Sequence, residues 1–456
     1  MNNQIFTVEF LVNYLSDYFL NYDYDIISGS SLLDPSVPMT FVMSAGLVQV
    51  ESSNSFDSKK NCYALVQNCF RYFDMKNIGV SLTHLSLFKM FGIFCLNSTN
   101  KYDNIQKIWK LLTKNFGLLP ESLWVTYFSG DKIINHEFEP DLQAYNILKK
   151  LGIFQDHILG QNANHNFWIQ GDMILDKKHI SKCGSNVEFF FDFGEDKKCG
   201  PKCSPGCRCG RFVEIVNILF VSYEINEKTK SVHEAKRPFI EIVIGVERIA
   251  MLLQNVLSIY EIDSIKPLIK HIQQYCSKNN QEKSIKSKYI IADHIRAILF
   301  LVVDGAPSPG KGGRARLMRQ LVRGLLTNQK LLNISNTFFI KSLVDTACNL
   351  YINKNTHIEL IKQTILNYIE SESKIFEKTI IKAMLRFNKI LNQNDNRYIN
   401  AKDILCLEKY YGLPLLLIEN ELTKKKVSYN KSAYDFEHAE WKKALSEGDK
   451  YYNDKK

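Results

Sequence analysis

The stretch RPFIEIVIGVERIAM, residues 237–251, combines a carboxylate with an arginine. Glu241, Val243 and Gly245 alternate with isoleucines, which predicts a strand that puts these three residues on one face. After Gly245 the apolar residues recur every three or four positions, as in a helix, and Arg248 lies in the first turn. A carboxylate and an arginine this close in the sequence predict a site for a charged ligand at the junction.

Four cysteines, Cys199, Cys203, Cys207 and Cys209, fall within the short segment CGPKCSPGCRCG. In a reducing compartment such a density more often indicates metal binding than disulfides. Four thiolates match a closed tetrahedral zinc site, and the glycines and proline among them permit tight turns. The spacing differs from the usual pair of CxxC motifs, so free thiols stay an alternative to structural zinc.

A basic helix is predicted near the middle of the second half of the chain. Arg316, Arg319 and Arg323 are three and four residues apart and therefore share one helix face. A glycine-rich stretch, GAPSPGKGG, leads into them. The plain interpretation is a solvated basic face, and the alternative, favoured by the flexible lead-in, is a stripe that contacts RNA phosphates.

The elements around these residues predict two domains. Residues 1–265 mix helices with strands such as TFVMSAG, VEFFFDFG, RFVEIVNILFVSY and FIEIVIG, and the short connections favour antiparallel pairing. A polar segment at 276–288 marks a boundary, and nearly every later segment has helical period. We expect an α+β domain over residues 1–265, with a Cys-rich insert at 199–209, and an all-α domain over residues 266–456.

Composition is that of a globular protein of 456 residues, 45% hydrophobic and 12% aromatic, with a formal net charge of +10. The charge permits an anionic partner such as nucleic acid without requiring one. The longest apolar run, AILFLVV, is too short to cross a bilayer, and the start MNNQIFTVEF has no export or organelle signal. The sequence therefore predicts a cytoplasmic, soluble protein with no membrane partner.

Several segments together resemble the alanyl-tRNA synthetase family of class II aminoacyl-tRNA synthetases. In the family's order they are SLLDPSVPMTFVMSAGLVQV, CFRYFDMKNIGVSLTHLSLFKMFG, NFWIQGD, RFVEIVNILF, FIEIVIGVERIAMLLQNV, YIIADHIRAILFLVVDG and YYGLPLLLIE. The resemblance implies a class II catalytic domain with an antiparallel sheet flanked by helices, then a helical domain that reads the tRNA acceptor stem. It also implies a short form that lacks the family's editing and C-terminal domains.

The resemblance assigns roles to three charged residues. Arg248 matches the third-motif arginine that binds ATP phosphate, and Arg71 matches the second-motif arginine that holds the α-phosphate. Glu241 matches the aspartate that binds the substrate's α-ammonium group. The reaction implies ATP and Mg²⁺ as cofactors.

Further residues match the family's substrate pocket, namely Trp168, Glu188, Asn217, Val243 and Gly245. Without the resemblance each has a structural alternative: Trp168 as a core residue, Asn217 as a satisfied strand amide, and Arg71 in a surface ion pair.

Departures from the family pattern affect the same pocket. Glu241 replaces the aspartate and Val243 replaces a glycine, so a smaller or displaced pocket is expected. Thr83 stands where an arginine is usual, and Lys89 replaces a glutamate, which predicts altered electrostatics. Alanine is the substrate implied by resemblance, and glycine, or another amino acid bound in a shifted pose, stays open.

Recognition of tRNA also departs from the family. Gly313, before Arg314, and Lys409 stand where the family reads a G·U pair with an Asn and an Asp, and neither offers a side-chain acceptor. The residues predicted to contact RNA are Arg314, Arg316, Arg319, Arg323 and Lys409. Two hypotheses remain: an ATP-dependent ligase that charges tRNA or another acceptor, or an inactive module that binds RNA or a partner protein.

Overall fold

The computed structural model describes residues 6–34, 42–45, 61–170, 180–226, 228–276, 281–352, 357–393 and 398–446, with backbone alone for 281–284, 445 and 446. The chain divides into two compact units, residues 1–270 with 303–306, and residues 271–302 with 307–456. Of the expected strand at 40–46, residues 42–45 are described, and they form no strand. Much of the segment 31–50 and the end of NFWIQGD lie outside the described residues.

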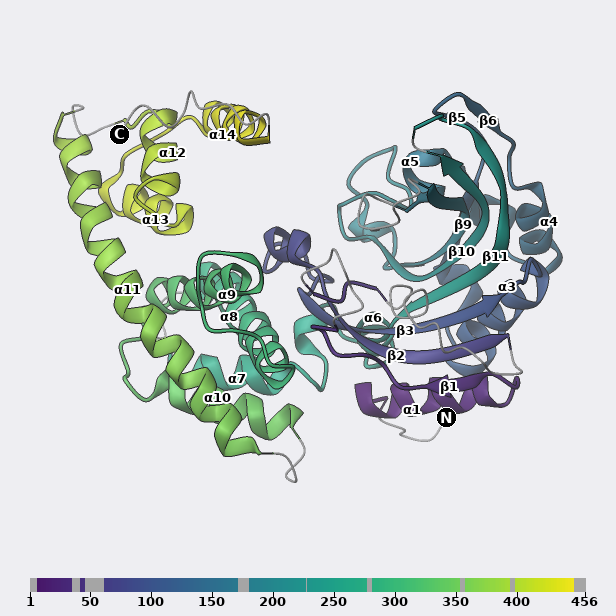
Figure 1. The fold of residues 1–456 in the computed structure, drawn as a ribbon, viewed down its shortest axis with the longest axis horizontal. Coiled ribbons are helices and arrows are strands. Elements are labelled where there is room, and N and C mark those ends of the chain that lie inside the picture. The colour runs from purple at the N-terminus through teal and green to yellow at the C-terminus, as the bar shows by residue number, and fades with distance from the viewer. Residues whose placement is uncertain are drawn as a thin grey trace. The chain divides into compact units, whose positions relative to one another are not determined.

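The first unit contains a nine-stranded, mostly antiparallel sheet (Figure 1). The strands of this unit are β1 (Asp25–Ile27), β2 (Cys62–Phe70), β3 (Leu87–Leu96), β4 (Leu123–Phe128), β5 (Asp131–Ile133), β6 (His136–Phe138), β7 (Ile158–Gln161), β8 (Phe167–Ile169), β9 (Ile180–Asp192), β10 (Phe212–Asn226) and β11 (Val232–Gly245). The sheet order is β1-β2-β3-β11-β10-β9-β4-β7, β8 pairs with β9, and β5 and β6 form a separate hairpin. With the helices described below, this arrangement confirms the predicted α+β fold class.

Two strand pairs at the edges of the sheet are parallel. The sequence had predicted antiparallel pairing, because most connections between the expected strands are short. The parallel pairs are β1 with β2, in the register Ile26 to Ala64, and β4 with β7, in the register Thr126 to Leu159. A parallel pair needs a crossover connection of a dozen residues or more, and both of these connections are long. The second of them includes helix α4 (Leu142–Lys150).

Helices cover one face of this sheet. The other helices of the unit are α1 (Val8–Leu20), α3 (Lys101–Lys110), α5 (Ala163–Asn166), α6 (Val246–Leu253) and α7 (Lys266–Gln274), whose end extends beyond it. Phe19 of α1 stacks on Phe91 of β3 with 5.7 Å between ring centroids. The Nζ atom of Lys101 lies 4.6 Å from the ring centroid of Phe220 in β10. Since side chains alternate along β11, Glu241 and Val243 point to the opposite face.

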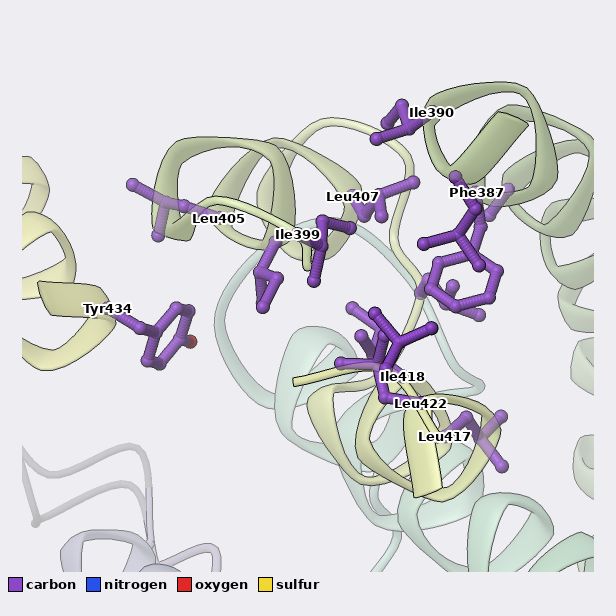
Figure 2. Packing of buried hydrophobic residues seen from close by; sticks show 14 of the residues in the cluster. Phe387, Ile390, Ile399, Leu405, Leu407, Leu417, Ile418, Leu422 and Tyr434 are labelled. Atoms are coloured by element: carbon purple, nitrogen blue, oxygen red, sulfur yellow. The ribbon is translucent and has the colours of Figure 1, made fainter. Parts of the chain in front are cut away.

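The second unit is helical, as predicted for this part of the chain. Its helices are α8 (Gln281–Val303), α9 (Gly313–Leu331), α10 (Phe339–Tyr351), α11 (Ile358–Gln393), α12 (Ala401–Lys409), α13 (Leu415–Lys425) and α14 (Lys431–Ser446). The end of α11 packs with α12 and α13 around Phe387, Leu407 and Ile418, all fully buried (Figure 2). Because these aliphatic and aromatic side chains recur at helical spacing, each helix contributes one apolar face to this core.

Candidate active site

The register of β9, β10 and β11 aligns the predicted pocket residues in rows across the sheet. Glu188 lies opposite Asn217, and Asn217 lies opposite Val243. The next row on this face pairs Leu219 with Glu241. Directly opposed residues share a sheet face, so side chains that are far apart in sequence meet on one surface.

A cavity of about 400 Å³ opens over this surface. All eight residues predicted for catalysis and substrate binding line it: Arg71, Trp168, Glu188, Asn217, Glu241, Val243, Gly245 and Arg248. Its volume is in the range of small-molecule sites. The structure thus brings the predicted residues into one site.

The two arginines of the cavity, Arg71 and Arg248, donate hydrogen bonds mainly to backbone carbonyl groups. Arg71 follows β2 directly, donates from Nε to the Ser44 carbonyl at 3.3 Å, and lies over the ring of Phe88. Arg248 donates from Nη1 to the Glu214 carbonyl at 2.8 Å, with a longer ion-pair distance of 3.6 Å to the carboxylate of that residue. Among the described residues Arg71 has no ion pair, so its charge is available to an anion in the cavity.

Helix α6 sets the position of Arg248. The strand β11 ends at Gly245, the N-cap of the helix, and Arg248 is the third helical residue. The first turn of a helix carries partial positive charge from its unpaired N–H groups. The sequence prediction of a strand that continues into a helix at this position is therefore confirmed.

A network of amides surrounds Glu188. Its Oε1 accepts hydrogen bonds from Asn186 Nδ2 at 3.0 Å and Asn217 Nδ2 at 2.9 Å. Burial and the neighbouring charge of Glu214 raise the pKa of Glu188 to about 8, against the opposing effect of these hydrogen bonds and Arg248. The repulsion between the two carboxylates disfavours simultaneous ionisation, and a divalent cation bound to both would relieve it.

We expect the free protein to lose stability as pH rises from about 5 to about 8. The folded state, in which the pKa of Glu188 is about 8, retains a proton that the unfolded state releases near pH 4.5. This contribution is complete below the unfolded pKa and disappears as pH rises through the folded pKa. Urea midpoints across this range measure it. Glu188→Gln should flatten the pH profile, and Glu214→Gln should move its upper end to lower pH; an unchanged profile in Glu188→Gln contradicts the assignment.

Glu214 also lines the cavity, although the sequence pattern did not predict it there. In a regular strand, residues 214 and 217 would point to opposite faces. A register shift against β9 lies between Glu214 and Val216, and it brings Glu214 to the same side as Asn217. The Asn217 Nδ2 atom lies 3.4 Å from Glu214 Oε1. Only the bulge makes this carboxylate a member of the site, and strand periodicity in the sequence gives no sign of it.

Lys89 does not line the cavity, which corrects the expectation that it alters the electrostatics there. Its neighbour Met90 faces the cavity, and Lys89 points to the helix-covered face, where Nζ lies 3.3 Å from Asn68 Oδ1. Its backbone N–H donates to the carboxylate of Glu247 at 2.9 Å. Thr83 does line the cavity, and its carbonyl accepts from Arg248 Nε at 3.4 Å.

The four cysteines of the insert gather in one cluster between β9 and β10. Their Sγ atoms all lie within 4.8 Å of one another, with 3.3 Å between Cys199 and Cys207 and 3.5 Å between Cys203 and Cys209. Zinc–sulfur bonds of about 2.3 Å place tetrahedral sulfurs about 3.8 Å apart, so the cluster fits a zinc ion. The base of this loop is closed by Arg211, which forms two 2.7 Å hydrogen bonds to the Asp192 carboxylate.

We expect the purified protein to contain about one zinc ion per chain, held by this cluster. Cys203→Ser should reduce the zinc content to a small fraction and lower the Tm by several degrees, because the loop between β9 and β10 loses its cross-link. Elemental analysis and thermal unfolding measure both effects. Cys406→Ser, a half-buried cysteine of α12, is the matched control. Wild-type protein without zinc after metal-replete expression would contradict the site.

The residues predicted to contact RNA in the second unit differ in their surroundings. Arg316 is exposed and Arg319 is half-buried on α9. Arg323 donates from Nε to the buried Glu372 carboxylate of α11 at 2.6 Å. Lys409 pairs with Glu408 at 2.9 Å and lies over the ring of Trp441. The arginine stripe of α9 is therefore divided between a helix-packing ion pair and a basic surface.

Comparisons with known proteins agree with these features. The sequence profile of the tRNA synthetases class II (A) matches residues 11–453. Alanine–tRNA ligase of Idiomarina loihiensis is 29% identical over 425 residues, covering 90% of this chain and 47% of that protein. The alanine–tRNA ligase of Francisella tularensis subsp. novicida is 30% identical over 440 residues, covering 94% and 48%. The chain thus spans about half the length of these relatives.

Among solved structures, apo histidyl-tRNA synthetase of S. aureus aligns with 13% identity and a TM-score of 0.33, over 54% of this chain and 66% of that one. In the described part of the chain, no helix has the length and apolar character needed to cross a membrane.

Proposed function

Because the chain belongs to the class II (A) tRNA synthetases, we propose that it joins a small amino acid to ATP and passes the acyl group to a tRNA. The observation that carries the proposal is that Arg71, Arg248 and Glu241 line one cavity. Similarity to two alanine–tRNA ligases favours alanine as the amino acid. The products of the first step would be an aminoacyl-adenylate and pyrophosphate.

The arginines would act on the phosphates of ATP. A carboxylate oxygen of the amino acid attacks the α-phosphorus, and the bond to the pyrophosphate oxygen breaks. Negative charge builds on the α-phosphoryl oxygens and on the leaving pyrophosphate as this occurs. Arg71 and Arg248 offer guanidinium donors already fixed by Ser44 and Glu214, so little reorganisation accompanies the reaction.

Glu241 would bind the ammonium group of the amino acid. Its side chain is 5% exposed and lines the cavity, which suits a charge-assisted contact with a small cation. Trp168 and Leu219 form an apolar wall in the same cavity. The carboxylate of the substrate would then point toward Arg71 and Arg248, which line the same cavity, Arg248 from the helix that follows β11.

Mg²⁺ would be held by the carboxylates of Glu188 and Glu214. Burial, and after it the charge of Glu214, raises the pKa of Glu188, and a bound cation would offset both effects. The ion supplies charge neutralisation for the pyrophosphate when bound. In the second unit, Arg314, Arg316 and Arg319 are the candidates for phosphate contacts with tRNA, since Arg323 is engaged by Glu372.

The direct test is amino-acid-dependent exchange of pyrophosphate into ATP, run across the twenty amino acids with and without total tRNA. Exchange with alanine or glycine supports adenylate formation, and charging of tRNA then tests the second step. Absence of exchange in folded, zinc-loaded protein that still binds RNA would favour an inactive RNA-binding module instead.

A further inference from the structure

A pair of cysteines lies on the helix-covered face of the sheet, opposite the cavity. Cys62 begins β2, Cys95 is near the end of β3, and the two are directly opposed in the register. Their Sγ atoms are 2.6 Å apart, and both are free thiols. They share this face with Ile240 of β11, which is paired with Cys95.

The hydrogen-bond pattern puts the pair at a position that accepts a cross-link. The N–H of Leu96 donates to the Asn61 carbonyl at 2.8 Å, which makes these two residues a hydrogen-bonded pair. The next pair, Cys62 with Cys95, is therefore a non-hydrogen-bonded pair, for which Cα atoms are typically about 4.5 Å apart. That separation falls inside the range of about 4.4–6.8 Å found in disulfides.

Polar groups around the pair favour reaction at Cys62. Tyr24 Oη lies 3.4 Å from Cys95 Sγ, and Lys107 Nζ lies 3.3 Å from that same hydroxyl. The hydrogen bond with Cys95 lowers the pKa of the Cys62 thiol, and the charge of Lys107 lowers it further. Cys62 is half-buried, whereas Cys95 is buried, so Cys62 is the thiol that small molecules can reach.

We propose that Cys62 and Cys95 form a dithiol site that a hydroperoxide oxidises to a cross-strand disulfide. The Cys62 sulfur takes the terminal oxygen of the hydroperoxide, the O–O bond breaks, and the departing alkoxide takes the thiol proton to give an alcohol. The Cys95 thiol then attacks the resulting sulfenic acid, an S–S bond forms and water leaves. The two thiols lose two electrons and two protons, which reduce the hydroperoxide.

The modification is expected to stabilise the sheet without affecting the proposed adenylation site. Cys62 begins β2, whereas Arg71 follows the other end of this strand. Arg71 also lines the cavity, on the face of the sheet opposite the two cysteines. A cross-link between the open ends of β2 and β3 restricts the unfolded chain. The inference is independent of the proposed function, because it needs neither ATP nor RNA.

Peptide mapping after treatment with hydrogen peroxide tests the proposal on the full-length, zinc-loaded protein. Trypsin releases Cys62 within residues 61–71 and Cys95 within residues 90–101. We expect these peptides to be joined, with a mass lower by two hydrogen atoms, and fragmentation to place the link at Cys62 rather than at Cys69. The Tm of oxidised protein should rise by several degrees and return after reduction.

Variants separate this disulfide from other oxidation. Cys62→Ser and Cys95→Ser should each abolish the joined peptides and the rise in Tm. Cys348→Ser, which removes a thiol whose pKa burial raises to about 11, should retain both effects. Cys95→Ser should also let Cys62 accumulate as sulfenic acid, which a dimedone label detects. Recovery of Cys62 and Cys95 as free thiols, or links only among the four zinc-site cysteines, would overturn the proposal.

Discussion

Arg248→Ala is expected to reduce kcat/KM for ATP–pyrophosphate exchange by about 10²–10³-fold. Its guanidinium lies at the N-terminus of α6 and is fixed by the Glu214 carbonyl at 2.8 Å. Removing it would take away a preorganised donor for charge that grows as pyrophosphate leaves. Steady-state exchange at varied ATP, with the expected amino acid saturating, measures the loss.

Two further variants show whether that loss belongs to the site. Arg248→Lys keeps the charge but not the fixed guanidinium, so an intermediate activity is expected. Arg237→Ala removes an exposed arginine of β11, the strand that precedes α6; it lies outside the cavity, and the variant should exchange within about twofold of wild type. Exchange by folded Arg248→Ala at the wild-type rate would falsify the proposed role of this arginine.

Val243→Gly is expected to change which amino acids the protein activates. Glu241, Val243 and Gly245 follow one another on the cavity face of β11, at intervals of about 6.8 Å. If Glu241 binds the ammonium group of the amino acid and Arg248 binds the phosphate of ATP, Val243 lies beneath the α-carbon of the amino acid. Its isopropyl group then limits the substrate side chain, and a glycine would leave more room.

In Val243→Gly, the ratio of kcat/KM for 2-aminobutyrate to kcat/KM for alanine is expected to increase by about 10–100-fold. One methylene in an apolar pocket has an effect of this order. Val243→Ala should lie between wild type and Val243→Gly. Val232→Ala, at the start of the same strand and outside the cavity, is the control. Equal preference ratios in all four proteins would show that Val243 does not set substrate size.

Much of the site could be predicted from local patterns in the sequence. Alternation up to Gly245 and helical period after it were enough to put Glu241 on a strand face and Arg248 in the first turn of a helix. The four closely spaced cysteines likewise indicated one cluster, since few residues separate them. These features depend on neighbours in the chain, and side-chain periodicity and short loops determine them directly.

Other features depended on pairing between distant segments. Glu214 lines the cavity because of a bulge in β10 against β9. Lys89 does not line it, because side chains alternate along β3 and that of Lys89 points to the other face of the sheet. The motifs shared with the family, in the same order, were enough to identify Arg71 and Trp168 as site residues. The side-chain contacts of these two residues could not be predicted in this way.

The sequence by itself determined the strand–helix junction, the cysteine cluster and the order of the family's motifs. Tertiary structure decided that Arg323 is bound to Glu372 and that Cys62 meets Cys95 across two strands. The physical reason is that helix packing and strand register are set by the burial of whole faces, and a shift of one residue would change every partner. No local pattern in either segment specifies which distant side chain will lie opposite.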